Sequence, residues 1–515
     1  MATKVFFGKK TAAFWLLTAA VTVGTAVMTL QLVFSVDMYR DSANVYAFMT
    51  RALSRGEYFE SFHPAIPCLN VILAQPLIRL GLRPEQALSA ISSLFYLATI
   101  PCLYMLLKRF VPETPAAFGA LLFVCASKII RFSCTGLIDS GKIFFLVAGL
   151  YFADRMIDEK FRSYKSALCF GAALGGLSLA RSEGIGNALI VFGCIGIFWL
   201  FRSIKEKRMM PILPMLASIA VWVLAILSRM WVNRRFCGKF IFDERIHNGI
   251  CKLLGGIASS TPKSAAADPV WVPPPREPVS WLEILDSFIR GCGEVYFGFA
   301  AAGAVLLLLA MCRNDNLRFI WPDKKPPKFF KWRGFYFILL ASAAGNALIF
   351  KLSTIGSYRY LLPNVPLVMI FVVIAAYWLW SWSAKLFPRP LRIVCALAVV
   401  VLLAFQVVNG AENIFSRYSR RQYRSGRAVS DAVSRENPRG KVWFRSACIE
   451  WYYSDTRRAV PIETPGRDIW KYDFDFVLIS HDDTDEVNIP FVVNLKEIEL
   501  PAGSTVRLFR KVEVK

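Results

Sequence analysis

The residues best suited to chemistry form a short polar cluster directly after the first long hydrophobic segment. This cluster consists of Asp37, Tyr39, Arg40, Asp41 and Ser42. Ionisable groups beside a bilayer are costly unless they face water or an opposite charge, so they indicate a functional site. Asp41 precedes a segment with apolar residues at helical spacing, which Ser42 can cap, and this makes it a candidate general base. The simpler alternative is that Asp37 and Asp41 only pair with Arg40 at the interface.

Five further ionisable residues lie at the ends of hydrophobic segments. They are Arg131, Asp139, Arg181, Glu183 and Arg359. An arginine at such a junction often only extends toward the interface, and Arg181 and Glu183 could simply pair with each other. If the topology brings all five to one membrane face with Asp41, a shared site becomes the better explanation.

Composition indicates the kind of structural element that carries these residues. The chain has 515 residues, 55% of them hydrophobic, with a mean hydropathy of +0.44, which is typical of an all-α polytopic membrane protein. About eleven segments are long and apolar enough to be membrane helices. They are 11–35, 86–107, 115–131, 138–153, 166–181, 185–201, 211–229, 294–312, 335–351, 363–381 and 393–410. The run 65–80 contains Pro67, Pro76 and Arg79, so we expect an interfacial helix in the first outer loop.

Lysine and arginine residues predict the orientation of these segments. They are densest in the loops 108–114, 154–165, 202–209, 313–334 and 385–392, which places those loops and the N-terminus in the cytoplasm. The polar cluster and the residues after 412 then lie outside, and we expect an inner (plasma) membrane location. We divide the chain into a membrane domain, 1–412, and an extracytoplasmic domain, 413–515. Strand-like runs at 441–444, 474–480, 491–495 and 505–512 predict that the second is a small α/β or β domain.

Several classes of function are disfavoured. The net charge of +24 could suggest nucleic acid, but basic residues that flank membrane helices set topology and contact anionic lipids, so we expect membrane lipids and no nucleic acid as partners. Twelve cysteines are scattered without a zinc-binding spacing, and there are only three histidines. We therefore expect no metal and no other cofactor.

Five stretches carry a resemblance to a known family. They are Tyr-Arg-Asp-Ser at 39–42 followed by Tyr46 and Gly56, His-Pro-Ala-Ile-Pro at 63–67, Gly-Leu-Ile-Asp at 136–139, Leu-Ala-Arg-Ser-Glu-Gly at 179–184, and Arg-Tyr-Leu-Leu-Pro at 359–363. Over residues 10–410 the chain resembles polytopic glycosyltransferases of the GT-C class, the group that contains protein O-mannosyltransferases (family 39) and lipid A aminoarabinose transferases. That family often has an adjacent acidic pair in its first loop, whereas Ser42 follows Asp41 here. Either Asp37 or Asp139 could supply the second carboxylate.

The resemblance implies a GT-C-like fold and a reaction. Such enzymes move a sugar from a polyprenyl-phosphate donor to an acceptor on the extracytoplasmic face, with inversion. It implies Asp41 as general base and Asp139 as a second catalytic residue. Arg359, Arg131 and Lys128 are candidates for the donor phosphate, because arginine forms forked contacts with phosphate oxygens. The implied substrate-binding residues are Arg40, Tyr46, His63, Arg131, Arg181, Glu183, Arg359 and Tyr360. The acceptor, whether protein, lipid or glycan, is left open.

The alternative class is a transporter or flippase of lipid-linked glycans. Transporters typically have repeated halves and ionisable sites near the bilayer midplane. This chain has no evident repeat, and its ionisable residues gather at one face, which favours the enzyme. An inactive relative that only binds lipid-linked glycans is a third alternative.

Overall fold

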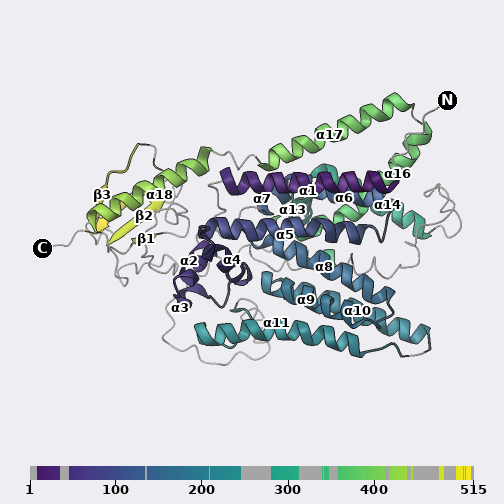
Figure 1. The fold of residues 1–515 in the computed structure, drawn as a ribbon, viewed down its shortest axis with the longest axis horizontal. Coiled ribbons are helices and arrows are strands. Elements are labelled where there is room, and N and C mark those ends of the chain that lie inside the picture. Colours follow the sequence, from purple (N-terminus) through teal and green to yellow (C-terminus); the bar gives the residue numbers. More distant parts are fainter. Residues whose placement is uncertain are drawn as a thin grey trace.

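The computed structural model describes most of the chain as a bundle of long helices (Figure 1). The described residues are 9–34, 46–133, 136–207, 209–244, 247, 280–312, 339, 341–346, 358–386, 388–411, 417–437, 442–444, 475–480, 495–502, 504 and 506–511. The bundle contains α1 (Lys9–Phe34), α5 (Pro84–Leu107), α6 (Glu113–Cys125), α7 (Ser127–Ser133), α8 (Asp139–Asp158), α9 (Tyr164–Ala180), α10 (Gly184–Lys205), α11 (Leu213–Cys237), α14 (Glu294–Cys312), α16 (Val365–Leu386) and α17 (Arg389–Ala411). Asp37, Arg40 and Asp41 lie outside the described residues.

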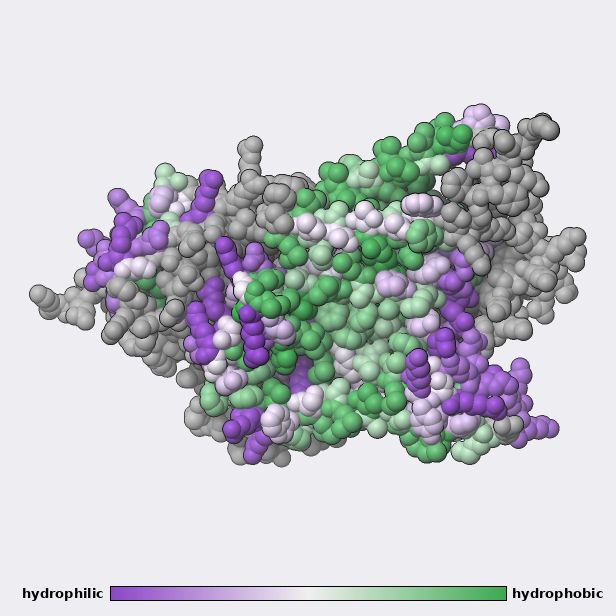
Figure 2. All heavy atoms as spheres, viewed as in Figure 1, coloured by the Kyte–Doolittle hydropathy of each residue, from purple (hydrophilic) through white to green (hydrophobic). Residues whose placement is uncertain are grey.

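The surface of the bundle has the pattern of a membrane protein. Figure 2 shows apolar side chains over its middle and hydrophilic side chains toward both ends. Within the described ranges, five helices are long and apolar enough to cross a membrane, or six if α6 and α7 count as one span. On α17, Val400, Val401, Phe405 and Val408 are all more than 60% exposed, as expected for side chains that face lipid. The chain is therefore a multi-pass membrane protein.

Helices lie over every predicted membrane segment except 335–351, which is described only at 339 and 341–346. The prediction of one continuous helix over 115–131 was wrong, because α6 and α7 meet at a bend of 60°. Ala126 between them has an extended backbone (ψ 114°), and its N–H bonds to the carbonyl of Phe123. Neither proline nor glycine marks this bend, so its cause is tertiary packing. A Cβ on Gly410 of α17 would lie 2.8 Å from the Ser127 carbonyl oxygen, so α17 packs directly on the bent part.

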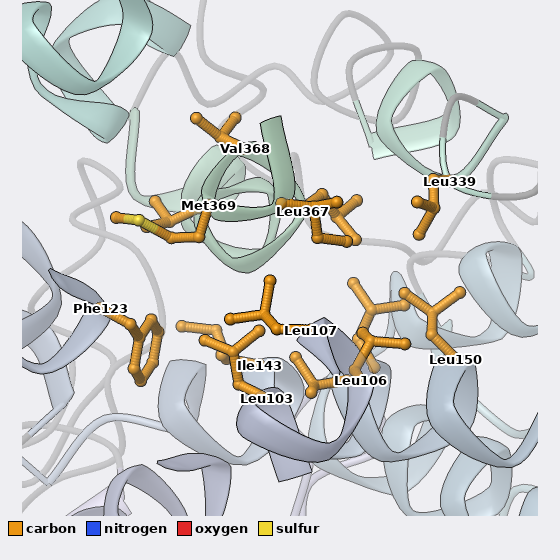
Figure 3. Packing of buried hydrophobic residues seen from close by; sticks show 14 of the residues in the cluster. Leu103, Leu106, Leu107, Phe123, Ile143, Leu150, Leu339, Leu367, Val368 and Met369 are labelled. Carbon is orange, nitrogen blue, oxygen red and sulfur yellow. The ribbon is translucent and has the colours of Figure 1, made fainter. Parts of the chain in front are cut away.

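The core of the bundle is a single large hydrophobic cluster. Figure 3 shows Leu103 and Leu107 of α5, Ile143 of α8 and Leu367 of α16 converging in it. Neighbouring helices approach closely where small residues allow it. A Cβ on Gly171 of α9 would lie only 2.2 Å from the Ser218 carbonyl oxygen of α11. This close approach fixes α9 and α11 relative to each other.

Three short helices follow α1 and pack over one end of the bundle. They are α2 (Phe48–Ser54), α3 (Tyr58–Ser61) and α4 (Leu69–Arg79). α4 lies within the run predicted as an interfacial helix and contains Pro76. A second hydrophobic cluster joins these helices to the start of α5 and the end of α11. In it, Phe236 of α11 stacks on Phe62 with ring centroids 5.0 Å apart.

The C-terminal part is one helix, α18 (Arg417–Glu436), packed on a small sheet. The strands are β1 (Val442–Phe444), β2 (Phe476–Ser480), β3 (Leu495–Ile498) and β4 (Val506–Lys511), in the order β1-β2-β4-β3. β1 and β2 are parallel, and the other pairs are antiparallel. Val429 and Val433 of α18 pack on Phe476 and Leu508 of the sheet. The predicted α/β character is confirmed, and β3 begins at Leu495, the last residue of the run predicted for it.

Candidate functional site

Arg181 binds two carboxylates at the end of the bundle that carries α2 to α4. It follows the last residue of α9 in an extended conformation. Its Nη1 donates a hydrogen bond to Oδ1 of Asp139, the first residue of α8, and its Nε donates to Glu183 Oε2 at 3.1 Å. The side chains of Arg181 and Asp139 are 5% and 1% exposed. The arginine therefore pairs with a residue on a separate helix as well as with its local neighbour Glu183.

Glu183 is held in its charged form. It is the N-cap residue of α10, just before the membrane-spanning part of that helix. Burial alone would raise the pKa of its carboxyl. The positive charges of Arg181 and Lys142, together with hydrogen bonds from the backbone and from Arg181, instead lower that pKa to about 2. Two carboxylates and two cations therefore lie together here, and their charges balance.

A second buried ion pair supports the turn that carries Arg181 and Glu183. Arg229 of α11 donates from Nη2 to Asp243 Oδ2 at 3.0 Å, and Ser182 Oγ donates to the same carboxylate. The segment after α11 folds back along the helix, because Asn233 Nδ2 donates to the carbonyls of residues 241 and 242. The turn is thus tied to the segment that follows α11.

Sequence reasoning missed Lys142, Arg229 and Asp243. A signal was present for the first two, because each is a charged residue inside or at the edge of a predicted membrane segment, and such residues usually have a specific role. Asp243 carried no comparable signal, since its partner Arg229 is 14 residues away across a reversal of the chain.

The connection between α1 and α5 helps to position Asp139. Asn70 Nδ2 of α4 and Ser92 Oγ of α5 both donate to the Leu137 carbonyl, at 3.4 Å and 2.7 Å. Ile138 belongs to the same hydrophobic cluster as Tyr46. Tyr46, a predicted substrate-binding residue, is therefore buried near the start of α8. His63 is exposed, and its Nδ1 accepts a hydrogen bond from the Ala65 N–H at 3.1 Å.

The elements that carry Arg131 and Arg359, two of the predicted phosphate-binding residues, both contact α8. Arg131 is exposed on α7, with its guanidinium 5.9 Å from the Phe132 ring centroid. Arg359 and Tyr360 belong to a 3-10 helix, η4 (Tyr358–Asn364), which contacts both α7 and α8. The structure thus joins Asp139, Arg181 and Glu183 directly, and it places α7 and η4 in contact with α8, the helix that begins at Asp139. Among the described residues no group of three or more His, Cys, Asp or Glu side chains could hold a metal ion, and metal independence stays a prediction.

These features define a class of fold: a multi-pass helical bundle with short helices over one end, buried charges at that end, and a small C-terminal α/β unit. It is the GT-C fold that the sequence resemblance implied. The structure matches the oligosaccharyltransferase AglB from Archaeoglobus fulgidus, solved with an inhibitory peptide and a dolichol-phosphate, with a TM-score of 0.61 and 12% identity over 92% of this chain and 70% of that one. It also matches ArnT from Cupriavidus metallidurans bound to undecaprenyl phosphate, with a TM-score of 0.56 and 12% identity over 96% of this chain and 97% of that one.

The apo structure of the same ArnT gives a TM-score of 0.56 at 14% identity, over 97% of this chain and 98% of that one. No protein-family model matches the sequence, and no curated protein matches it in sequence either. Identities this low establish a shared fold, while the activity has to be argued from the site.

Proposed function

We propose that this protein is an integral membrane glycosyltransferase that moves a sugar from a polyprenyl-phosphate donor to an acceptor on the extracytoplasmic face, with inversion. The observation that carries the proposal is the buried Asp139–Arg181–Glu183 cluster, at the end of a GT-C bundle where α7 and η4 also meet. Structures of this fold have been solved with dolichol-phosphate and with undecaprenyl phosphate. The same class of lipid donor would suit the arginine-bearing elements here.

Asp41 is the proposed general base. It precedes Tyr46 by five residues, and a chain of five residues spans at most about 18 Å. Tyr46 and Ile138, the residue before α8, belong to one hydrophobic cluster, which supports the proposal that Asp41 acts together with Asp139. Its carboxylate would accept the proton of the acceptor hydroxyl or amine as that atom attacks the anomeric carbon. The bond from that carbon to the phosphate oxygen then breaks, and polyprenyl phosphate leaves.

The remaining residues would bind and orient substrates. Arg359, Arg131 and Lys128 are proposed to neutralise the departing phosphate, with Arg40 as an electrostatic neighbour of Asp41. Tyr46, His63 and Tyr360 are proposed to contact substrate. Asp139 is the proposed second carboxylate, with Asp37 as the alternative, and Arg181 would hold it in position through their hydrogen bond.

The proposed orientation follows from the two ends of the bundle. The end opposite Asp139 carries basic loops in which Arg109 pairs with Asp154 and Asp158, and Arg155 pairs with Glu159. Basic loops favour the cytoplasm. The membrane domain, 1–412, would then hold its site at the extracytoplasmic face of the inner membrane, with the domain 413–515 outside.

The test is a transfer assay with the purified full-length protein in lipid vesicles. The donors are undecaprenyl-phosphate hexoses and pentoses, the acceptors are envelope protein, lipid and glycan fractions, and the readout is labelled sugar in the acceptor together with free undecaprenyl phosphate. We expect transfer from at least one donor. Absence of transfer together with movement of a lipid-linked glycan between leaflets would instead support the flippase alternative.

A further inference from the structure

Two buried polar side chains lie one helical turn beyond the Asp139–Arg181–Glu183 cluster along α8 and α10. Lys142 of α8 and Asn187 of α10 are each 1% exposed. Neither the amide nitrogen nor the amide oxygen of Asn187 has a hydrogen-bond partner. The Lys142 ammonium group is buried beside these charges and interacts electrostatically with Glu183, Arg181 and Asp139. The Asn187 amide can therefore form hydrogen bonds that the described residues do not supply.

The two side chains face the same space. Lys142 lies one helical turn after Asp139, and Asn187 lies one turn after Glu183, so each is on the face of its helix that carries the charged cluster. α8 and α10 contact each other, and the charge of Lys142 also acts on the Glu183 carboxyl. Lys142 and Asn187 therefore form the two sides of one buried polar region.

Two further buried asparagines lie on elements that contact α8 and α10. Asn346 Nδ2 donates to Asn364 Oδ1 at 2.8 Å, and Asn346 Oδ1 and Asn364 Nδ2 have no partner. Asn364 ends η4, the helix that carries Arg359 and contacts α8. A Cβ on Gly345 would lie 2.2 Å from Ile190, one turn beyond Asn187, so the segment 341–346 packs against α10 at this level. Elements that contact one another, namely α8, α10, η4 and the segment 341–346, thus each contribute a buried polar side chain to this part of the bundle.

The energetics argue that this region has a ligand. A buried polar atom left without a partner costs about 1–3 kcal/mol, and an apolar residue of similar size would avoid that cost. Most buried polar side chains in proteins are hydrogen-bonded, so a group of exceptions needs an explanation. The ligand is not an extra anion, because Arg181 and Lys142 already balance the charges of Asp139 and Glu183. One ammonium and three amides can instead donate to and accept from a set of hydroxyl groups.

We infer that Lys142, Asn187 and Asn364 bind the hydroxyl groups of the sugar carried by the lipid donor and select which sugar is transferred. This inference rests on the proposed function and names the part of the substrate that these residues recognise. A site that hydrogen-bonds a hydroxyl group rejects analogues that lack it, because its own polar atoms are then left unpaired. The sugar preference should therefore change when these side chains are made apolar, while the phosphate is bound elsewhere by arginines.

The experiment compares two probes on the full-length protein in detergent: undecaprenyl phosphate alone and the undecaprenyl-phosphate sugar that gives the highest transfer. Lys142→Met and Asn187→Leu remove polar groups at nearly constant volume. We expect each variant to bind the sugar-bearing lipid about 10-fold more weakly, as for loss of one or two hydrogen bonds, and to bind undecaprenyl phosphate as before. Asn187→Gln, which keeps the amide, should retain part of the affinity.

The control is Asp154→Asn, which disturbs a buried ion pair at the opposite end of α8 and should affect neither probe. Equal losses for both probes would overturn the inference, because they would assign Lys142 and Asn187 to the phosphate or to folding. Unchanged affinity for both probes would also overturn it and leave a hydrated structural cluster. If the unmodified protein binds and transfers from no donor, the proposed function itself fails, which is a separate outcome. Should Lys142→Met not fold, the two Asn187 variants decide the question.

Discussion

Arg181 donates a hydrogen bond to the carboxylate of Asp139, a residue 42 positions earlier in the chain, and both side chains are buried. Removing one member of a buried ion pair leaves the other charge uncompensated and typically costs about 3–5 kcal/mol. We expect Arg181→Gln to lower the melting temperature of the purified protein strongly, and the double variant with Asp139→Asn to recover part of the loss. A double variant that melts no higher than Arg181→Gln would contradict a direct coupling. Arg290→Gln, at an exposed ion pair, is the control.

The base assignment predicts a catalytic defect without a binding defect. Asp41→Asn keeps the size of the side chain and removes its ability to accept a proton, so transfer should fall by about 10²–10⁴-fold. Binding of undecaprenyl phosphate, followed by native mass spectrometry, should be unchanged. Glu57→Gln, at an exposed carboxylate in the same connection, is the control. Full transfer by Asp41→Asn, or an equal loss in both variants, would refute the choice of Asp41.

Gly184 is needed by the turn that presents Arg181 and Glu183. Its N–H bonds to the Arg181 carbonyl at 2.9 Å, and a Cβ on it would lie 2.0 Å from the Leu177 carbonyl oxygen. Gly184→Ala must therefore shift the backbone of the turn, and we expect reduced thermal stability together with reduced transfer. Gly193 in the same helix has nothing within 4 Å of the corresponding Cβ. Gly193→Ala should be neutral or more stable, by up to about 1 kcal/mol, and a similar effect of both changes would disprove the steric argument.

The depressed pKa of Glu183 predicts a pH-dependent contribution to stability. The carboxyl has a pKa of about 2 in the folded protein against 4.5 as its ordinary value. Its charged form therefore stabilises the fold fully above pH 4.5, and this contribution, at most about 3 kcal/mol, is lost as the pH falls toward 2. Glu183→Gln should melt at a lower temperature than the unmodified protein at pH 7, with the difference shrinking below pH 4.5. A difference that stays constant between pH 7 and pH 3 would contradict this role.

The proposed topology can be checked with single cysteines in a cysteine-free variant. Lys160→Cys is at an exposed position in a basic loop, and Glu499→Cys is at an exposed position after β3. In intact cells a membrane-impermeant thiol reagent should label the second position only, and both should react after the membrane is permeabilised. Labelling of Lys160→Cys alone in intact cells would reverse the orientation.

Much of the architecture was predictable because long apolar segments have one favourable state in a bilayer, the hydrogen-bonded helix. This reason accounts for the agreement at α1, α5, α10, α11 and α17. It fails at Ala126, where the bend between α6 and α7 has no proline or glycine to mark it and depends on packing against α17. The strands β2 and β4 were predictable from their β-branched and aromatic runs, while their pairing order was not.

The sequence by itself determined that this is a multi-pass membrane protein, that its ionisable residues gather at helix ends, and that its motifs resemble the GT-C class. Each of these depends on composition or on residues that are close in the chain. Only the tertiary structure decided that Arg181 joins Asp139 to Glu183, that Asp243 supports the turn through Ser182 and Arg229, and that Lys142 and Asn187 lie buried below them. Such contacts arise where helix ends from distant parts of the chain meet, and hydrophobic periodicity fixes which face of a helix is buried but not which partner it meets there.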